Sequence, residues 1–285
     1  QRRTPSCGTS KGKPVNNQSP EDFSYPEQDD TESTVAWAAT PQADSKPAAK
    51  TSSRKPRPYI TYTLLGLTIA VYLLQMLTTS LFGFDVPVQL GVKVNELIAQ
   101  GQVWRLITPI LLHGSIVHIG FNMYALYLFG PNLESSFGHW RFLALYLIGG
   151  FAGNVFSMMF TEAASLGSST AIFGLLGAQG VFIHHNRKIF GEQVSQASLR
   201  RIIQVAAINL VIGLSPGIDN WGHIGGLIGG TIFTWLGGPL IEVRGLHPNY
   251  MLVDRREKSE IVQADAIATG FFIVIAIAAL YLVNR

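Results

Sequence analysis

The chain has 285 residues, of which 47% are hydrophobic and only 14% are charged, whereas soluble domains contain roughly 25% charged residues. A single cysteine, Cys7, excludes an internal disulfide framework and argues against a cysteine nucleophile. The net charge of +3 does not predict a nucleic-acid partner, because the basic residues are divided among apolar segments, as the topology of a membrane protein requires. We therefore expect an all-α integral membrane protein surrounded by the lipid bilayer.

Residues 1–58 are rich in Ser, Thr, Pro, Lys and Asp and show no hydrophobic periodicity. This composition predicts a disordered polar N-terminal tail, followed by a membrane domain over residues 59–285. The first residue is not methionine, so we interpret the chain as a fragment or a processed form. The acidic run between Glu21 and Glu32 is atypical of transit peptides, which indicates mature tail behind any removed targeting segment.

Apolar stretches follow the tail, and most are near the ~20 residues that span a bilayer. The second, fourth and fifth are short, which indicates helices that begin below the membrane surface with water reaching them. Between the first two lies a semi-apolar loop, Ser80 to Ser115, whose Trp104-Arg105 pair favours the headgroup layer. The seven stretches are Tyr59–Thr79, Ile116–Gly130, Trp140–Phe160, Ser169–His184, Ile202–Leu214, Trp221–Ile241 and Ala266–Val283.

The basic residues from Lys46 onward predict the orientation. Only Lys93, Arg105 and Arg285 fall on the side opposite to the N-terminus. Positive residues favour the cytosolic side, so the N-terminus is expected in the cytosol or in an organellar equivalent such as the stroma. The charges do not identify the membrane; an organellar membrane such as the chloroplast envelope is one interpretation, with the plasma membrane or an endomembrane as the alternative. The fourteen residues on the N-terminal side are Lys46, Lys50, Arg54, Lys55, Arg57, Arg141, Arg187, Lys188, Arg200, Arg201, Arg244, Arg255, Arg256 and Lys258.

A polar turn, Leu166-Gly167-Ser168-Ser169-Thr170, begins the fourth stretch. A serine at a helix start lies beside unsatisfied backbone N–H groups and a partial positive charge, which suit an anionic tetrahedral intermediate. Ser and Thr are also the commonest helix N-caps, so capping by these hydroxyls is the alternative.

Further polar side chains fall at the same depth. His118 and Asn122 lie in the first turns of the second stretch, and His223 lies at the start of the sixth. The alternatives are that His118 and Asn122, which share a helix face, only join helices by hydrogen bonds, and that His223 is an interfacial histidine. Together with Ser169 they supply a nucleophile, a base and oxyanion donors, as nucleophilic catalysis requires.

Glycines follow His223 on its own helix face, because Gly226 and Gly230 are three and seven residues further on. This spacing lets two membrane helices approach closely, which a short histidine needs in order to reach a serine on a neighbouring helix. Ordinary tight packing is the alternative. The fourth stretch offers small residues to the same contact: Ala171, Gly174, Gly177 and Ala178.

The run from about Tyr59 to Val283 resembles the rhomboid intramembrane serine proteases. The resemblance implies a six-helix core with a seventh C-terminal transmembrane helix, as in the eukaryotic type. It implies Ser169 as nucleophile and His223 as general base. The implied oxyanion hole comprises His118, Asn122 and the backbone N–H of Ser169. The shared motifs are Trp104-Arg105, His113-Gly114-Ser115-Ile116-Val117-His118 with Asn122-Met123, Gly167-Ser168-Ser169 with Ala171-Ile172-Phe173-Gly174, and His223 with Gly226 and Gly230.

One position departs from the family motif Gly-x-Ser-Gly, because Thr170 follows Ser169. Alignment on the downstream Ala-Ile-Phe-Gly leaves Ser168 in the variable position, so Ser168 is not favoured as the nucleophile. A β-branched threonine adds bulk beside the nucleophile, while its hydroxyl can satisfy a free backbone group at the helix start. We expect an active but slow or selective enzyme in which Thr170→Gly raises turnover.

The sequence thus predicts a cofactor-free endopeptidase that cleaves transmembrane or membrane-adjacent segments of membrane proteins, with single-pass helices as the expected substrates. The alternative is a catalytically weak or inactive rhomboid-like protein that binds membrane clients, but the presence of both Ser169 and His223 favours catalysis. A transporter would need charged residues within its helices. Asp219, in the loop before His223, is interpreted as a solvated loop residue, with contact to the site as the alternative. Neither His113 nor His139 belongs to a metal-binding motif.

The charge distribution predicts the topology. The tail before Tyr59 and the loop from Arg244 to Lys258 should occupy one compartment and Arg285 the other, because positive residues remain on the cytosolic side. Protease protection or cysteine accessibility in sealed membranes measures all three positions. Placement of the tail and Arg285 on the same side would refute seven spans.

Overall fold

A computed structural model describes residues 57–245 and 250–283 of the chain. The chain divides into two units, Gln1–Ser52 and Ser53–Arg285, and every described residue belongs to the second. Apart from Arg57 and Pro58, the predicted disordered tail therefore lies outside the described residues.

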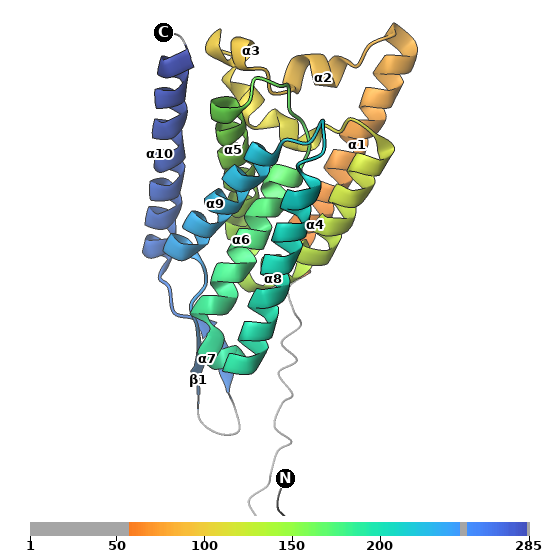
Figure 1. Cartoon of the computed structure of the whole chain (residues 1–285). Coiled ribbons are helices and arrows are strands. Elements are labelled where there is room, and N and C mark those ends of the chain that lie inside the picture. Colours follow the sequence, from red (N-terminus) through yellow and green to blue (C-terminus); the bar gives the residue numbers. More distant parts are fainter. Residues whose placement is uncertain (1–56, 246–249, 284–285) are drawn as a thin grey trace, which may run out of the picture. The chain divides into compact units, whose positions relative to one another are not determined.

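Long helices make up most of the described residues (Figure 1). The helices of 17 residues or more are α1 (Tyr59–Phe82), α4 (Ile116–Phe137), α5 (His139–Phe160), α6 (Ser169–His185), α8 (Glu192–Ile212), α9 (Asn220–Gly237) and α10 (Lys258–Val283), and the short α7 (Arg187–Phe190) connects α6 and α8. Each long helix overlaps one predicted stretch, so the predicted all-α membrane fold is confirmed. Three of them, α1, α5 and the Lys258–Tyr281 part of α10, are long and apolar enough to cross a membrane by length and composition. The count of seven spans remains a prediction.

Several long helices extend beyond their predicted stretches, and α10 begins at Lys258 rather than Ala266. α8 begins at Glu192 rather than Ile202, because its polar first turns are compatible with a helix and hydropathy alone detects only the apolar end. α4 continues through Pro131 rather than ending at Gly130. The proline removes one backbone donor without ending the helix, and the additional turn brings Glu134 to the start of α1.

Glu134 joins α4 to the N-terminus of α1. Its buried carboxylate accepts hydrogen bonds from the backbone N–H groups of Ile60 (2.9 Å) and Thr61 (2.7 Å) and from the Thr61 hydroxyl (2.6 Å). His139 Nδ1 lies 2.5 Å from the same carboxylate. Because an acidic group satisfies free donors at a helix start and complements the helix dipole, α1 is anchored at this end.

The predicted loop between the first two stretches is folded into short helices. Trp104 is half exposed, and its Nε1–H donates to the carbonyl oxygen of Leu90 at 3.0 Å. Arg105 is buried, and its guanidinium donates to the carbonyl oxygens of Gln89 and Val92 at 2.7 Å each. The placement of the loop in the headgroup layer stays a prediction. The Trp-Arg pair therefore closes the loop on itself. The elements of the loop are α2 (Val86–Gly91), α3 (Asn95–Ala99) and the 3-10 helices η1 (Val103–Leu106) and η2 (Thr108–Leu111).

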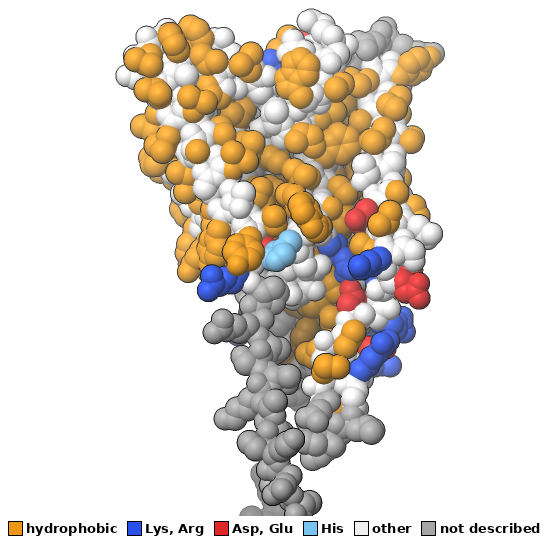
Figure 2. Space-filling view, turned by 180° about the vertical axis from the view of Figure 1, so that it is seen from behind, with side chains coloured by type: hydrophobic (Ala, Val, Ile, Leu, Met, Phe, Trp, Pro, Cys, Tyr) orange, Lys and Arg blue, Asp and Glu red, His pale blue; other side chains and the backbone are white. Residues whose placement is uncertain are grey.

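The predicted sixth stretch reaches Ile241, whereas α9 ends at Gly237. Pro239 cannot continue a helix, and the chain forms an antiparallel hairpin of β1 (Ile241–Arg244) and β2 (Met251–Asp254), in which Ile241 pairs with Asp254. Arg141 on α5 forms an ion pair with Asp254 at 2.9 Å. Figure 2 shows charged side chains gathered toward this end and apolar side chains over much of the remaining surface.

The tightest helix contacts are those of α9 with α5 and α6 (Figure 1). Glycines make them. A Cβ at Gly230 would lie 1.9 Å from the carbonyl oxygen of Gly174, and one at Gly226 would lie 2.0 Å from that of Thr170. On α5, a Cβ at Gly149 would lie 3.2 Å from the Cα of Gly174. The predicted close approach of the histidine and serine helices is therefore confirmed.

Gly230→Ala is expected to lower the free energy of unfolding by about 1–3 kcal/mol or more, because the new methyl overlaps backbone that cannot move aside. Gly270→Ala in α10 is the control, since a Cβ there meets nothing within 4 Å. Thermal unfolding in detergent measures both variants. Equal midpoints would contradict a glycine-mediated contact between α6 and α9.

Candidate active site

Ser169 and His223 meet where α6 and α9 begin. Ser169 is the first residue of α6, and His223 lies in the first turn of α9. The Nε2 of His223 lies 3.0 Å from Ser169 Oγ, which is hydrogen-bonding distance. His223 is buried and Ser169 is partly exposed. The glycine contact brings the two backbones close enough for an imidazole to reach the hydroxyl.

Phe173 holds the ring of His223. The two rings are stacked, with centroids 4.3 Å apart and planes inclined by 11°. Phe173 lies four residues after Ser169 and hence on the same face of α6. In the sequence Phe173 stands out only as part of a motif, and its four-residue spacing from the serine is the signal that identifies its role.

Two hydroxyls of the serine turn do not serve as helix caps. Ser168 is the N-cap residue of α6 but makes no side-chain capping hydrogen bond. The Thr170 hydroxyl is buried without a hydrogen-bond partner among the described residues. The capping alternative is therefore wrong for these two side chains, as is the expectation that Thr170 satisfies a backbone group.

Gly167 lets His118 reach the serine turn. Its φ of +131° is one that L side chains rarely adopt, and a Cβ there would lie 2.8 Å from two atoms of the His118 ring. The same Cβ position is 3.6 Å from Ser169 Oγ, so His118 and Ser169 both border this glycine. The Gly167 N–H donates to the carbonyl oxygen of Pro109 at 2.9 Å, which ties the turn to η2.

Asn122 lies one turn after His118 on α4 and is buried. Its Nδ2 donates to the carbonyl oxygen of His118 at 3.1 Å. Of the two side chains predicted as oxyanion donors, the structure therefore places His118 beside the serine turn and directs the Asn122 amide along its own helix.

A second histidine and serine pair adjoins the first. The Nε2 of His113 lies 3.3 Å from Ser168 Oγ, and these two residues are 1% and 0% exposed. Burial of the imidazole, with a smaller contribution from His118, lowers the pKa of His113 to about 4, so the ring is neutral at pH 7. A closed pair does not suit a nucleophile, which agrees with the place of Ser168 in the motif. His139, the other histidine considered as a metal ligand, contacts Glu134 instead.

Asp219 is a helix cap rather than a solvated loop residue. Its Oδ1 accepts a hydrogen bond from the Gly222 N–H at 2.9 Å, and its other carboxylate oxygen is buried. A carboxylate suits this position because the free N–H groups of a helix start need acceptors. The cap defines the first turn of α9, on which His223 lies.

Thr170 packs between α5 and α9. A Cβ at Gly153 would lie 2.6 Å from Thr170 Cβ, and one at Gly222 would lie 3.0 Å from Thr170 Cγ2. The side chain is only 3% exposed. Glycines on two neighbouring helices thus accommodate the bulk of Thr170, which explains how a residue larger than glycine fits after the serine.

Thr170→Val is expected to raise the free energy of unfolding by about 1 kcal/mol, because a methyl of similar shape replaces a buried hydroxyl without a partner among the described residues. Thr170→Gly should lower it by about 1–3 kcal/mol through lost packing and helix propensity. Thermal unfolding in detergent compares the three proteins. A less stable Thr170→Val would mean that the hydroxyl has a partner.

The part of the chain that forms this site is similar in sequence to known rhomboid proteins. The model of the Rhomboid domain family matches residues 100–240. The chain is 42% identical to Rhomboid protease GluP of Bacillus subtilis (strain 168) over 175 residues, which cover 61% of this chain and 34% of the relative. It is 30% identical over 159 residues to RHOMBOID-like protein 9, chloroplastic, of Arabidopsis thaliana, covering 56% of this chain and 37% of the relative.

A third relative, RHOMBOID-like protein 6, mitochondrial, of Arabidopsis thaliana, is 40% identical over 144 residues, which cover 50% of this chain and 46% of the relative. The chain thus spans between a third and a half of the length of these relatives. The matched residues include the serine turn and the four polar residues around it, which are His113, His118, Asn122 and His223. With its helical membrane fold and these matches, the chain belongs to the rhomboid family, whose members are integral membrane proteins.

Proposed function

We propose that the protein is an intramembrane serine endopeptidase that hydrolyses transmembrane or membrane-adjacent segments of other membrane proteins. The proposal depends on one observation, the 3.0 Å distance between Ser169 Oγ and His223 Nε2 within an apolar helix bundle. Similarity to a relative named a rhomboid protease supports it. The proposal involves no cofactor.

In the proposed reaction Ser169 is the nucleophile and His223 the general base. Nε2 accepts the hydroxyl proton while Oγ attacks the scissile carbonyl carbon, which forms a tetrahedral oxyanion. The intermediate collapses, the C–N bond breaks, and His223 gives the proton to the leaving amine. Water, deprotonated by His223, then hydrolyses the acyl-enzyme ester, and the proton returns to Ser169.

The oxyanion needs donors that are already in place. We assign this role to the Ser169 N–H, which belongs to the first turn of α6 where N–H groups lack helical partners, together with His118 and Asn122. The His118 ring borders the turn at Gly167. Asn122 would exchange its hydrogen bond to the His118 carbonyl for one to the oxyanion.

A serine–histidine dyad lacks the carboxylate that orients the histidine in a catalytic triad, so it needs another means of orienting the histidine. Stacking on Phe173 restricts rotation of the His223 ring. The Asp219 cap fixes the first turn of α9 and hence the backbone of His223. These two contacts supply the orientation that a carboxylate provides in a triad.

We propose membrane proteins as the substrates, with single-pass helices as the expected class. Apolar side chains are exposed on α4 beside His118, including Val117 (62%) and Phe121 (73%), so an apolar helix could approach this side through lipid. We place the N-terminus on the cytosolic or stromal side. Relatives named chloroplastic and mitochondrial favour an organellar membrane such as the chloroplast envelope, with the plasma membrane or an endomembrane as the alternative.

The second candidate is a catalytically weak or inactive rhomboid-like protein that binds membrane clients. The observation that favours it is Thr170, which stands where the family motif has glycine. A fluorophosphonate, which labels activated serines, distinguishes the two candidates. Labelling of the detergent-solubilised protein at Ser169 supports catalysis, whereas a folded protein that is not labelled supports client binding.

Ser169→Ala and His223→Ala are each expected to reduce cleavage of a model membrane substrate by at least about a thousand-fold, because each removes one member of the dyad. Expression and membrane insertion should be unchanged. Cleavage is measured on gels after reconstitution into liposomes.

Ser168→Ala is the comparison variant, since it removes a neighbouring hydroxyl that does not contact His223. It also removes the Oγ contact with His113, so its effect on cleavage should be mild by comparison, no more than about ten- to a hundred-fold. Undiminished cleavage by Ser169→Ala would disprove the mechanism.

A further inference from the structure

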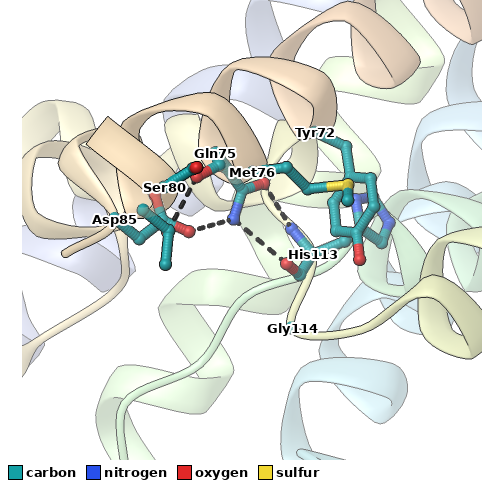
Figure 3. Close-up of a pocket in the computed structure, with 8 residues that line it drawn as sticks. Tyr72, Gln75, Met76, Ser80, Asp85, His113 and Gly114 are labelled. Atoms are coloured by element: carbon teal, nitrogen blue, oxygen red, sulfur yellow. Dashed lines mark hydrogen bonds between the residues drawn. The ribbon is translucent and has the colours of Figure 1, made fainter. Parts of the chain in front are cut away.

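Gln75 in α1 holds the backbone of His113. The His113 N–H donates to Gln75 Oε1 at 3.1 Å, and Gln75 Nε2 donates to the His113 carbonyl oxygen at 3.0 Å. Nε2 also donates to Asp85 Oδ2 at 2.8 Å. Figure 3 shows these three bonds, and Gln75 is 2% exposed. We name Gln75, Asp85 and His113 the Gln75 clamp.

The Gln75 clamp has fixed partners on both sides. Asp85 is the N-cap residue of α2, and its Oδ1 accepts a hydrogen bond from the Val88 N–H at 2.9 Å. α1 is anchored at its opposite end by Glu134. A planar amide with two hydrogen bonds to one residue leaves the His113 backbone little freedom to rotate.

His113 transmits this restraint to the serine turn. Its Nε2 lies 3.3 Å from the Oγ and 3.5 Å from the backbone N of Ser168. Ser168 directly precedes Ser169, so the place of the His113 ring influences where α6 begins. Because the His113 ring is neutral at pH 7, this contact does not change near neutral pH.

We propose that Gln75 is a positioning residue, which holds His113 against Ser168 and thereby fixes the placement of Ser169 relative to His223. The kinetic part of this inference rests on the proposed function. The structural part, namely that the serine turn is held through Gln75, is independent of the proposed function.

Substitution of Gln75 should loosen the turn without unfolding the protein. The Gln75 clamp lies in the wall of a pocket of about 380 Å³ that is also lined by Tyr72 and Met76. Water in this pocket can hydrogen-bond to the His113 backbone once the amide is gone. The backbone groups are then satisfied but no longer held in one place, and a displacement of about 1 Å at reacting groups can cost about a hundred-fold in rate.

The test compares Gln75→Met, which keeps the side-chain length and removes all three hydrogen bonds, with Met76→Ala. Met76 lies on the same helix, lines the same pocket and is outside the Gln75 clamp. On the full chain in detergent we would measure kcat and KM with a model substrate, the rate of fluorophosphonate labelling at Ser169, and amide hydrogen exchange over residues 165–172.

Gln75→Met should lower kcat and the labelling rate by roughly ten- to a hundred-fold with little change in KM. It should also accelerate exchange in residues 165–172, while Met76→Ala leaves every quantity near the wild-type value. Wild-type kcat and wild-type exchange in Gln75→Met would overturn the inference. Accelerated exchange throughout α5 and α9 would also overturn it, because Gln75 would then be purely structural. If the wild-type protein neither cleaves nor is labelled, the proposed function fails, yet exchange accelerated only at residues 165–172 still supports the positioning role.

Discussion

The distance between Ser169 and His223 depends on the lack of side chains where α6 and α9 touch. Gly226 and Gly230 lie directly on the backbone of α6, where even a methyl group would overlap a carbonyl oxygen. In a bilayer no hydrophobic force drives helices together, so close packing must hold them. The same contact therefore supplies cohesion between the two helices and brings a serine within 3.0 Å of a histidine.

A second constraint is the satisfaction of polar groups around the serine turn. The fully buried Lys93 donates from Nζ to the carbonyl oxygens of Ser157 (3.3 Å), Thr161 (2.8 Å) and Ala163 (3.1 Å), at and beyond the end of α5. Burial lowers the pKa of Lys93, an effect that nearby acids oppose. The Lys93 backbone also pairs with Ser165, so the segment before α4 serves as a scaffold for the turn that leads into α6.

The departure from the family motif is accommodated by packing between helices. Thr170 lies against Gly153 on α5 and Gly222 on α9, where any larger residue would collide with it. The threonine therefore joins three helices at the level of the site. Its buried hydroxyl has no hydrogen-bond partner among the described residues, so shape rather than polarity accounts for its fit, and the dyad geometry is retained beside it.

Consecutive residues determine the membrane class, the seven apolar stretches and the candidate residues Ser169 and His223, because hydropathy and helix-face spacing are local properties. The same spacing identifies the glycine face of α9. Only the tertiary structure decides that Gln75 holds His113, 38 residues away, because a glutamine in an apolar helix has no local signal that names its partner. It likewise decides that Thr170 fills space between glycines on two other helices. Such contacts depend on which backbones lie side by side, and that is set by packing across the whole bundle.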